Sequence, residues 1–283
     1  MSVPETIAKF LRQIDISEVI YALGAGVLAF WLLRTSLGRR ALISSQPRRN
    51  NMPRYVPFAI LIFWVTITTL GLVAADYLLE NEPDQTGLFW GNLIQCLGSA
   101  VSIVLMVFWA HRSFARGLKG FGFNPRKLPK DIPFAFLNLL AAWPVVAAVL
   151  VITGLAGKFL FGPDFTIEPH QELQTLRQYS QWSMAAVIFI NAAIVTAVFE
   201  EMLFRGFFQT MIRSHIARPW LSVLLSSVLF ALVHVNVAHW PALFVLGACL
   251  GYAYEKSGSL FRPIIMHALF NGFMVISVLL AAR

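Results

Sequence analysis

The stretch MAAVIFINAAIVTAVFEEMLFRGFF, residues 184–208, decides the fold class of this chain. About 20 predominantly apolar residues are enough to cross the hydrocarbon core of a bilayer as one helix. The first 16 residues of the stretch hold no charged side chain, and Glu200, Glu201 and Arg205 follow them. The stretch therefore predicts a membrane-spanning helix that carries ionisable groups at a depth where they are costly.

The rest of the chain has the same apolar character. Of its 283 residues, 58% are hydrophobic and 13% are charged, whereas soluble domains carry about 25% charged residues. This composition excludes a disordered chain, a nucleic-acid-binding domain with a solvated basic face and an ordinary cytosolic enzyme. Seven further apolar segments have helical character: 18–33, 56–79, 88–110, 132–155, 220–239, 242–254 and 264–280. We therefore expect an all-α polytopic membrane protein with about eight transmembrane helices.

The net charge of +8 comes from basic residues that gather between the apolar segments. Segment 111–131 holds six Lys or Arg and one acid, and segment 80–87 holds three acids and no base. Segment 34–55 holds six arginines and no acid: Arg34, Arg39, Arg40, Arg48, Arg49 and Arg54. Because Lys and Arg mark cytoplasmic loops, we expect both basic segments to face the cytoplasm, in the cell (plasma) membrane. The expected partner of this charge distribution is the lipid bilayer, and no nucleic acid is expected.

Ionisable and amide side chains at membrane depth are concentrated in the second half of the chain. Besides Glu200, Glu201 and Arg205, the apolar segments there hold His234, His239, His267 and Asn271. Glu201 and Arg205 are four residues apart, so they share a helix face and can form an ion pair. Glu200 is rotated by about 100° from Glu201, so the adjacent carboxylates can have different tasks. The sets FALVH (230–234) and HALFN (267–271) repeat the four-residue spacing, which predicts one stripe of a helix for each.

Helix geometry also predicts which of these residues lie close together. If helices 184–208 and 220–239 form a hairpin that turns near Ala217, Glu200 and His234 are each 17 residues from the turn. At 1.5 Å per residue, both lie roughly 25 Å from it. We therefore expect this carboxylate and this imidazole to face each other at one level.

Three kinds of chemistry are consistent with these residue types. A carboxylate in an apolar cleft is a suitable general base for water, and an imidazole can pass on its proton. With an oxyanion site from a second His and an Asn, Glu200, His234, His267 and Asn271 supply the groups for amide hydrolysis without a covalent nucleophile. In a zinc-dependent version, Glu200, His234 and His267 are the candidate ligands, although the sequence has no HExxH motif. A proton- or ion-coupled transporter is the third interpretation.

The three motifs EExxxR (200–205), FxxxH (230–234) and HxxxN (267–271), in this order, resemble a known family signature. It is that of the type II CAAX prenyl protease and bacteriocin-processing (Abi) family of intramembrane proteases. The resemblance covers about residues 180–280. We therefore expect a protease core at 180–283, preceded at 1–179 by transmembrane helices in which no motif is recognised.

The resemblance implies an intramembrane endopeptidase whose cavity lies within the C-terminal helices and opens toward the cytoplasmic side. Its substrate would be a peptide or a membrane-tethered protein. Members of the family are often labelled metalloproteases, and we favour a glutamate-dependent mechanism without a bound metal. The resemblance implies that Glu200 activates the water with His234 as its partner. It also implies that Glu201 and Arg205 hold the site together. His267 and Asn271 would stabilise the oxyanion.

Overall fold

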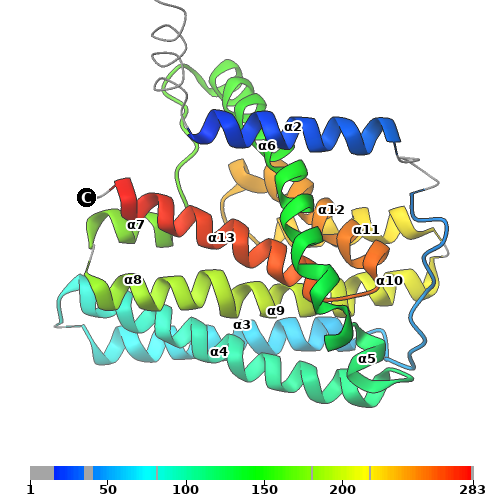
Figure 1. Ribbon diagram of the computed structural model, residues 1–283. Coiled ribbons are helices and arrows are strands. Elements are labelled where there is room, and N and C mark those ends of the chain that lie inside the picture. The colour runs from blue at the N-terminus through cyan, green and yellow to red at the C-terminus, as the bar shows by residue number, and fades with distance from the viewer. Residues whose placement is uncertain (1–15, 35–40, 81, 180, 217, 282–283) are drawn as a thin grey trace, which may run out of the picture.

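The computed structural model describes residues 16–34, 41–80, 82–179, 181–216 and 218–281. Within these ranges the chain forms helices and connecting segments and no strand, apart from one isolated antiparallel bridge between Asn50 and Phe114. Arg39, Arg40 and Ala217, which the sequence analysis used for the topology and the hairpin, lie outside the described residues. The predicted all-α fold of a polytopic membrane protein is confirmed (Figure 1).

Each of the eight predicted segments is helical over most of its length. In the described part of the chain, six helices are long and apolar enough to cross a membrane: Val56–Leu78, Asp84–Ser113, Pro125–Phe161, Trp182–His215, Val237–Ser257 and Phe261–Ala281. Two shorter apolar helices, Glu18–Leu33 and Pro219–Leu232, account for the other two segments.

Among the described residues up to 179, the structure has the 3₁₀ helix η2 (Pro125–Lys127) and these α-helices: α2 (Ile16–Arg34), α3 (Val56–Leu78), α4 (Asp84–Ser113), α5 (Gly117–Phe121), α6 (Leu128–Phe161) and α7 (Gln171–Gln178). Proline lies in the first turn of both α3 and α6, where its fixed φ and missing N–H suit a helix start. Gly162 follows α6 with a φ of 103°, a conformation that favours glycine.

The second half begins with one long helix whose α-helical winding is interrupted by two π-helical segments. It consists of α8 (Trp182–Phe189), the π-helical segment η3 (Ile190–Thr196), α9 (Ala197–Glu200), the π-helical segment η4 (Glu201–Gln209) and α10 (Thr210–His215). Isolated π turns are frequent at functional sites. Glu200 is thus the last residue of a short α-helical stretch, and Glu201 begins a π-helical one.

The chain then returns through α11 (Pro219–Leu232), the short 3₁₀ helix η5 (Val237–His239), α12 (Trp240–Ser257) and α13 (Phe261–Ala281). The prediction of one helix over 220–239 was wrong, because α11 ends at Leu232. Two side chains explain the early end: the ring of His234 donates to the carbonyl of Phe230, and Asn236 caps η5 by accepting from Ala238 N. Side chains that satisfy backbone groups in this way compete with helix continuation.

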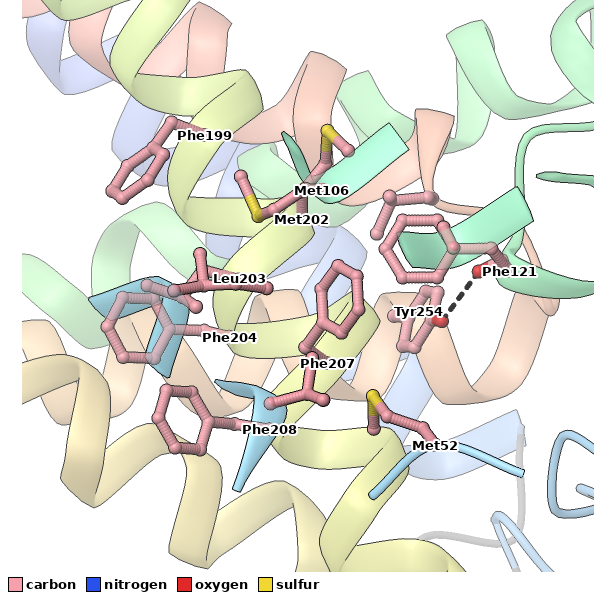
Figure 2. Close-up of a cluster of buried hydrophobic side chains, with 14 of the residues drawn as sticks. Met52, Met106, Phe121, Phe199, Met202, Leu203, Phe204, Phe207, Phe208 and Tyr254 are labelled. Carbon is pink, nitrogen blue, oxygen red and sulfur yellow. Dashed lines mark hydrogen bonds between the residues drawn. The ribbon is translucent and has the colours of Figure 1, made fainter. Parts of the chain in front are cut away.

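The long helix lies in the middle of the packing (Figure 1). It contacts α3 and α4 on one side and α11, α12 and α13 on the other. Helix α6 crosses α12 and α13, and α2 packs against α6. Around η4, large apolar side chains form the core of Figure 2, which includes Met52, Met106, Phe121, Phe199, Met202, Leu203, Phe204, Phe207, Phe208 and Tyr254. Gly206 lies inside this core, where a Cβ would overlap the ring of Phe121. The packing therefore holds the charged part of the long helix in a dense apolar setting.

Candidate active site

Glu201 and Arg205 form the predicted ion pair in the interior. Arg205 donates from Nη1 to Glu201 Oε1 over 2.7 Å, and the two side chains are 1% and 0% exposed. Arg205 also donates from Nη2 to the carbonyl of Gly247 on α12 over 3.2 Å, and its guanidinium lies 4.5 Å from the ring centre of Phe230. Removing one partner of such a pair leaves an uncompensated buried charge, so the pair fixes η4 against α11 and α12.

His267 connects this ion pair to Glu200. Its Nδ1 lies 2.8 Å from Glu201 Oε1, and because an ionised carboxylate only accepts hydrogen bonds, Nδ1 is the donor. Its Nε2 points the other way and lies 3.7 Å from Glu200 Oε2. The buried imidazole of α13 thus sits between the two adjacent carboxylates of the long helix, a contact that spacing in the sequence did not predict.

His234 faces the other carboxylate oxygen of Glu200. Its Nδ1 is 2.8 Å from the carbonyl of Phe230, so Nδ1 carries a proton and Nε2 faces Glu200 Oε1 at 4.0 Å. Glu200 and His234 therefore face each other, as their equal distances from the hairpin turn predict. His234 lies beyond the end of α11, however, so the expected helix stripe with Phe230 was wrong. The hydrogen bond to the Phe230 carbonyl and a donation from Trp240 Nε1 to the His234 carbonyl hold it instead.

Phe230 and the partial exposure of Glu200 complete the geometry. The Phe230 ring centre lies 5.1 Å from that of His234 and 5.9 Å from that of His267, both nearly edge to face. The side chains of Glu200 and His234 are 15% and 21% exposed, in contrast to the sealed Glu201–Arg205 pair. The arrangement presents one carboxylate to the Nε2 atoms of two imidazoles, whose Nδ1 atoms are both fixed.

Asn271 has a separate place in the structure. Its side-chain amide donates to the carbonyl of Ala192 in η3 over 2.8 Å, which joins α13 to the long helix. Among the hydrogen bonds and ion pairs of the described ranges, none links Asn271 to the other five predicted site residues. The structure therefore brings five of the six together and gives Asn271 an interhelical contact.

A histidine that the sequence analysis missed lies beside the site. The ring of His170 stacks on that of His239 at 4.3 Å and lies 6.4 Å from that of His234. Two residues before His170, the carbonyl of Glu168 accepts from His239 Nε2 over 2.8 Å and from Asn236 Nδ2. Burial, followed by the nearby His239 and His234, lowers the pKa of His170 to about 4. The clue in the sequence was His239, at the end of the apolar segment 220–239.

Zinc is the cofactor that the sequence left open, with Glu200, His234 and His267 as candidate ligands. Both rings anchor Nδ1 and present Nε2, an orientation typical of metal-binding histidines. Within the described residues, however, no three His, Cys, Asp or Glu side chains are arranged to hold a metal ion. Glu200, His234 and His267 are thus not arranged as a zinc site in this structure.

The fold and the site define a helical, polytopic membrane protein with a glutamate–histidine centre in its C-terminal helices. Residues 181–273, which include all six predicted site residues, match the family model "Type II CAAX prenyl endopeptidase Rce1-like". This part of the chain is similar to that family, in agreement with the resemblance found from the three motifs.

Two curated proteins are similar over a longer stretch. The chain is 33% identical to the membrane-embedded CAAX protease MroQ of Staphylococcus aureus (strain USA300) over 167 residues, which are 56% of this chain and 65% of that protein. It is 29% identical to an uncharacterised 24.3 kDa protein of Escherichia coli over 136 residues, 46% of this chain and 60% of the relative. The chain thus spans 60 to 65% of the length of these relatives. No solved structure matches it.

Proposed function

We propose that this protein is an intramembrane endopeptidase that hydrolyses a peptide bond with a water molecule activated by Glu200 and His234. The observation that carries the proposal is the placement of Glu200 between the Nε2 atoms of two histidines, at 4.0 and 3.7 Å. Both distances are longer than a direct hydrogen bond and suit groups that share a water molecule.

The tautomer of His234 supports its partnership with Glu200. Because Nδ1 donates to the Phe230 carbonyl, Nε2 of the neutral ring is an acceptor. A water molecule can then donate one proton to Glu200 and the other to His234, and direct a lone pair at the substrate carbonyl. Glu200 takes one proton of the water as the carbon–oxygen bond forms. When the carbon–nitrogen bond breaks, Nε2 of His234 takes the second proton and passes it to the leaving amine, and Glu200 then releases its proton to solvent.

His267 is the proposed donor to the oxyanion. Its Nδ1 donates to Glu201, so Nε2 donates as well only when the ring is doubly protonated. In that state the charges of Glu200, Glu201, Arg205 and His267 sum to zero, which suits a buried site. We propose Asn271 as a second donor, through the amide N–H that does not bond to Ala192.

The proposed substrate is a peptide or a membrane-tethered protein, and the name of the relative from S. aureus makes a C-terminal CAAX segment the first to test. The experiment compares cleavage by purified wild type, by Glu200→Gln, and by wild type treated with a chelator. We expect Glu200→Gln to lower kcat/KM by about 10²–10⁴-fold without changing thermal unfolding. Glu172→Gln, in a half-buried carboxylate of α7, is the matched control and keeps full activity.

Two outcomes of that experiment would change the proposal. Undiminished turnover by Glu200→Gln would overturn it. Activity that the chelator abolishes and that zinc alone restores would assign the zinc-dependent version, with Glu200, His234 and His267 as ligands. We expect chelation to leave the rate unchanged.

We propose that the basic segments face the cytoplasm, that the protein lies in the plasma membrane and that substrate enters from the cytoplasmic side. Ser44, in the basic segment 34–55, is exposed, so Ser44→Cys in a background without Cys96 and Cys249 reports on the side that this segment faces. Labelling by an impermeant maleimide is expected only after permeabilisation, and labelling of intact cells would contradict a cytoplasmic position of the basic segments.

A further inference from the structure

From Arg205 to Arg213, toward the C-terminal end of the long helix, polar side chains contact α12 at regular intervals. Three side chains spaced four residues apart on the long helix bond to three residues spaced four apart on α12. In each pair, the α12 residue comes 42 positions later in the chain. The pairs are Arg205 with Gly247, Gln209 with Gly251 and Arg213 with Glu255. We name this set the polar ladder.

The contacts of the ladder are short and buried. Gln209 donates from Nε2 to the carbonyl of Gly251 over 3.1 Å and to Glu255 Oε2 over 3.2 Å. Arg213 donates from Nε to Glu255 Oε1 over 3.1 Å. Side chains of this polarity are seldom buried without partners, so the ladder specifies how the two helices align.

Glycine on α12 makes the ladder possible. A Cβ at Gly251 would lie 2.7 Å from Gln209 Oε1 and 3.1 Å from a methyl carbon of Val223. The GxxxG spacing of Gly247 and Gly251 therefore does more than let two helices approach each other. It exposes the two backbone carbonyls that Arg205 and Gln209 use as acceptors.

The ladder begins within the π-helical segment that carries the site. Segment η4 has nine residues, from Glu201 to Gln209, whereas π-helices usually occur as single turns. Contacts outside the helix must therefore favour this winding over the α-helical one. A change of winding between Glu201 and Arg213 would rotate the carboxylates relative to α12 and would break the rungs at Gln209 and Arg213.

We infer that Gln209, Arg213 and Glu255 are positioning residues of the active site. They hold η4 in its π-helical register and so place Glu201 Oε1 within 2.8 Å of His267 Nδ1, which aims His267 at Glu200. The far end of the ladder is closed by the first half of the chain: Ser45 donates from Oγ to Glu255 Oε1 over 2.9 Å and accepts from Arg213 at its carbonyl. The inference rests on the proposed function.

The test replaces Gln209, which touches no reacting group, by an apolar residue of similar length. In Gln209→Met both hydrogen bonds of the middle rung are lost. We expect kcat per folded enzyme to fall about 10- to 100-fold, because a displacement of about 1 Å at the reacting groups has this cost, while KM changes less than about two-fold. Gly251→Ala should do the same through its overlap with Gln209. Gly26→Ala, where a Cβ has no neighbour within 4 Å, is the control and keeps the wild-type kcat.

A second variant separates positioning from general stability. Gln209→Glu brings a carboxylate beside Glu255 and lacks the donor for the Gly251 carbonyl. Protonation restores an O–H donor, so the kcat of this variant relative to wild type rises as the pH is lowered from about 8 to about 5, whereas that of Gln209→Met does not.

The outcomes distinguish this inference from the proposed function. A wild-type protein that cleaves nothing overturns both. A wild type that cleaves, together with a Gln209→Met variant of wild-type kcat, overturns the positioning role alone. Loss of folded Gln209→Met protein with an unchanged kcat in the folded remainder also overturns it, because the ladder then serves stability only.

Discussion

Glu200 and Glu201 are neighbours in the chain, yet their carboxylates lie in two different regions of the site. Glu201 is fully buried and bonded to Arg205 at 2.7 Å and to His267 at 2.8 Å. Glu200 is 15% exposed, and the nitrogen atoms that face it are 3.7 and 4.0 Å away. One carboxylate is thus held tightly by fixed partners, while the other faces groups with which it can share a reactant.

The difference shows how a membrane helix can carry two adjacent charges. We call the contacts among Glu201, Arg205 and His267 the tight region. There Arg205 neutralises Glu201, and Glu201 orients His267. We call Glu200 and the His234 imidazole that faces it the loose region. There Glu200 stays accessible, which chemistry on a substrate requires. The change from α9 to η4 falls between the two residues, so the local winding of the helix directs them to different neighbours.

The largest expected effect comes from breaking the tight region. Arg205→Met leaves Glu201 buried without its cation, and we expect the free energy of unfolding to fall by about 3–5 kcal/mol. The double variant Glu201→Gln with Arg205→Met removes both charges and should recover part of that loss. Denaturant titration in detergent measures both. A double variant no more stable than Arg205→Met would show that charge pairing is not the tight region's main contribution.

The helices and the tight pair were predictable because they follow from local rules. Bilayer thickness fixes the length of an apolar helix, so each of the eight segments was located. The pairing of Glu201 with Arg205 follows from four-residue spacing. The end of α11 at Leu232 was not predictable from hydropathy, because it depends on His234 and Asn236 bonding to nearby backbone groups.

The contacts of His267 and the polar ladder depend on helix winding and depth, which composition does not encode. The depth of His267 is set by packing of α13 rather than by the hairpin. Nothing in the residues 190–209 predicts π-helical turns, so the alignment of Gln209 with Gly251 was missed. A visible signal was the repeat of polar residues at 201, 205, 209 and 213, which continues the motif beyond Arg205.

Asn271 has two alternative roles, one beside the reacting groups and one as a contact between helices. As an oxyanion donor it serves the loose region, and we expect Asn271→Ala to lower kcat about 10²-fold. As an interhelical contact to Ala192 alone, it would cost only about 0.6 kcal/mol of stability and little activity. Steady-state kinetics and denaturant titration on the same preparation separate the two roles. A normal kcat with slightly reduced stability would remove Asn271 from the proposed catalytic set.

The smallest effect concerns His170, which extends the loose region through its contacts with His239 and His234. The pKa of His170 is lowered to about 4 in the folded protein, against about 6.5 in an unfolded chain. Between these values the unfolded state binds more protons, so this residue makes stability fall as the pH drops from about 6.5 to about 4. Above about 6.5 it contributes no pH dependence.

Replacing His170 by Phe keeps a ring for stacking on His239 and removes the proton-binding group. We expect the loss of unfolding free energy between pH 7 and pH 5 to be smaller in His170→Phe than in wild type, by about 1–2 kcal/mol. Gln174→Met is the control, because it removes a hydrogen bond to Pro169 in the same segment without removing a titratable group, and it should shift stability equally at both pH values. An identical pH dependence in His170→Phe and wild type would show that the loose region ends at His234.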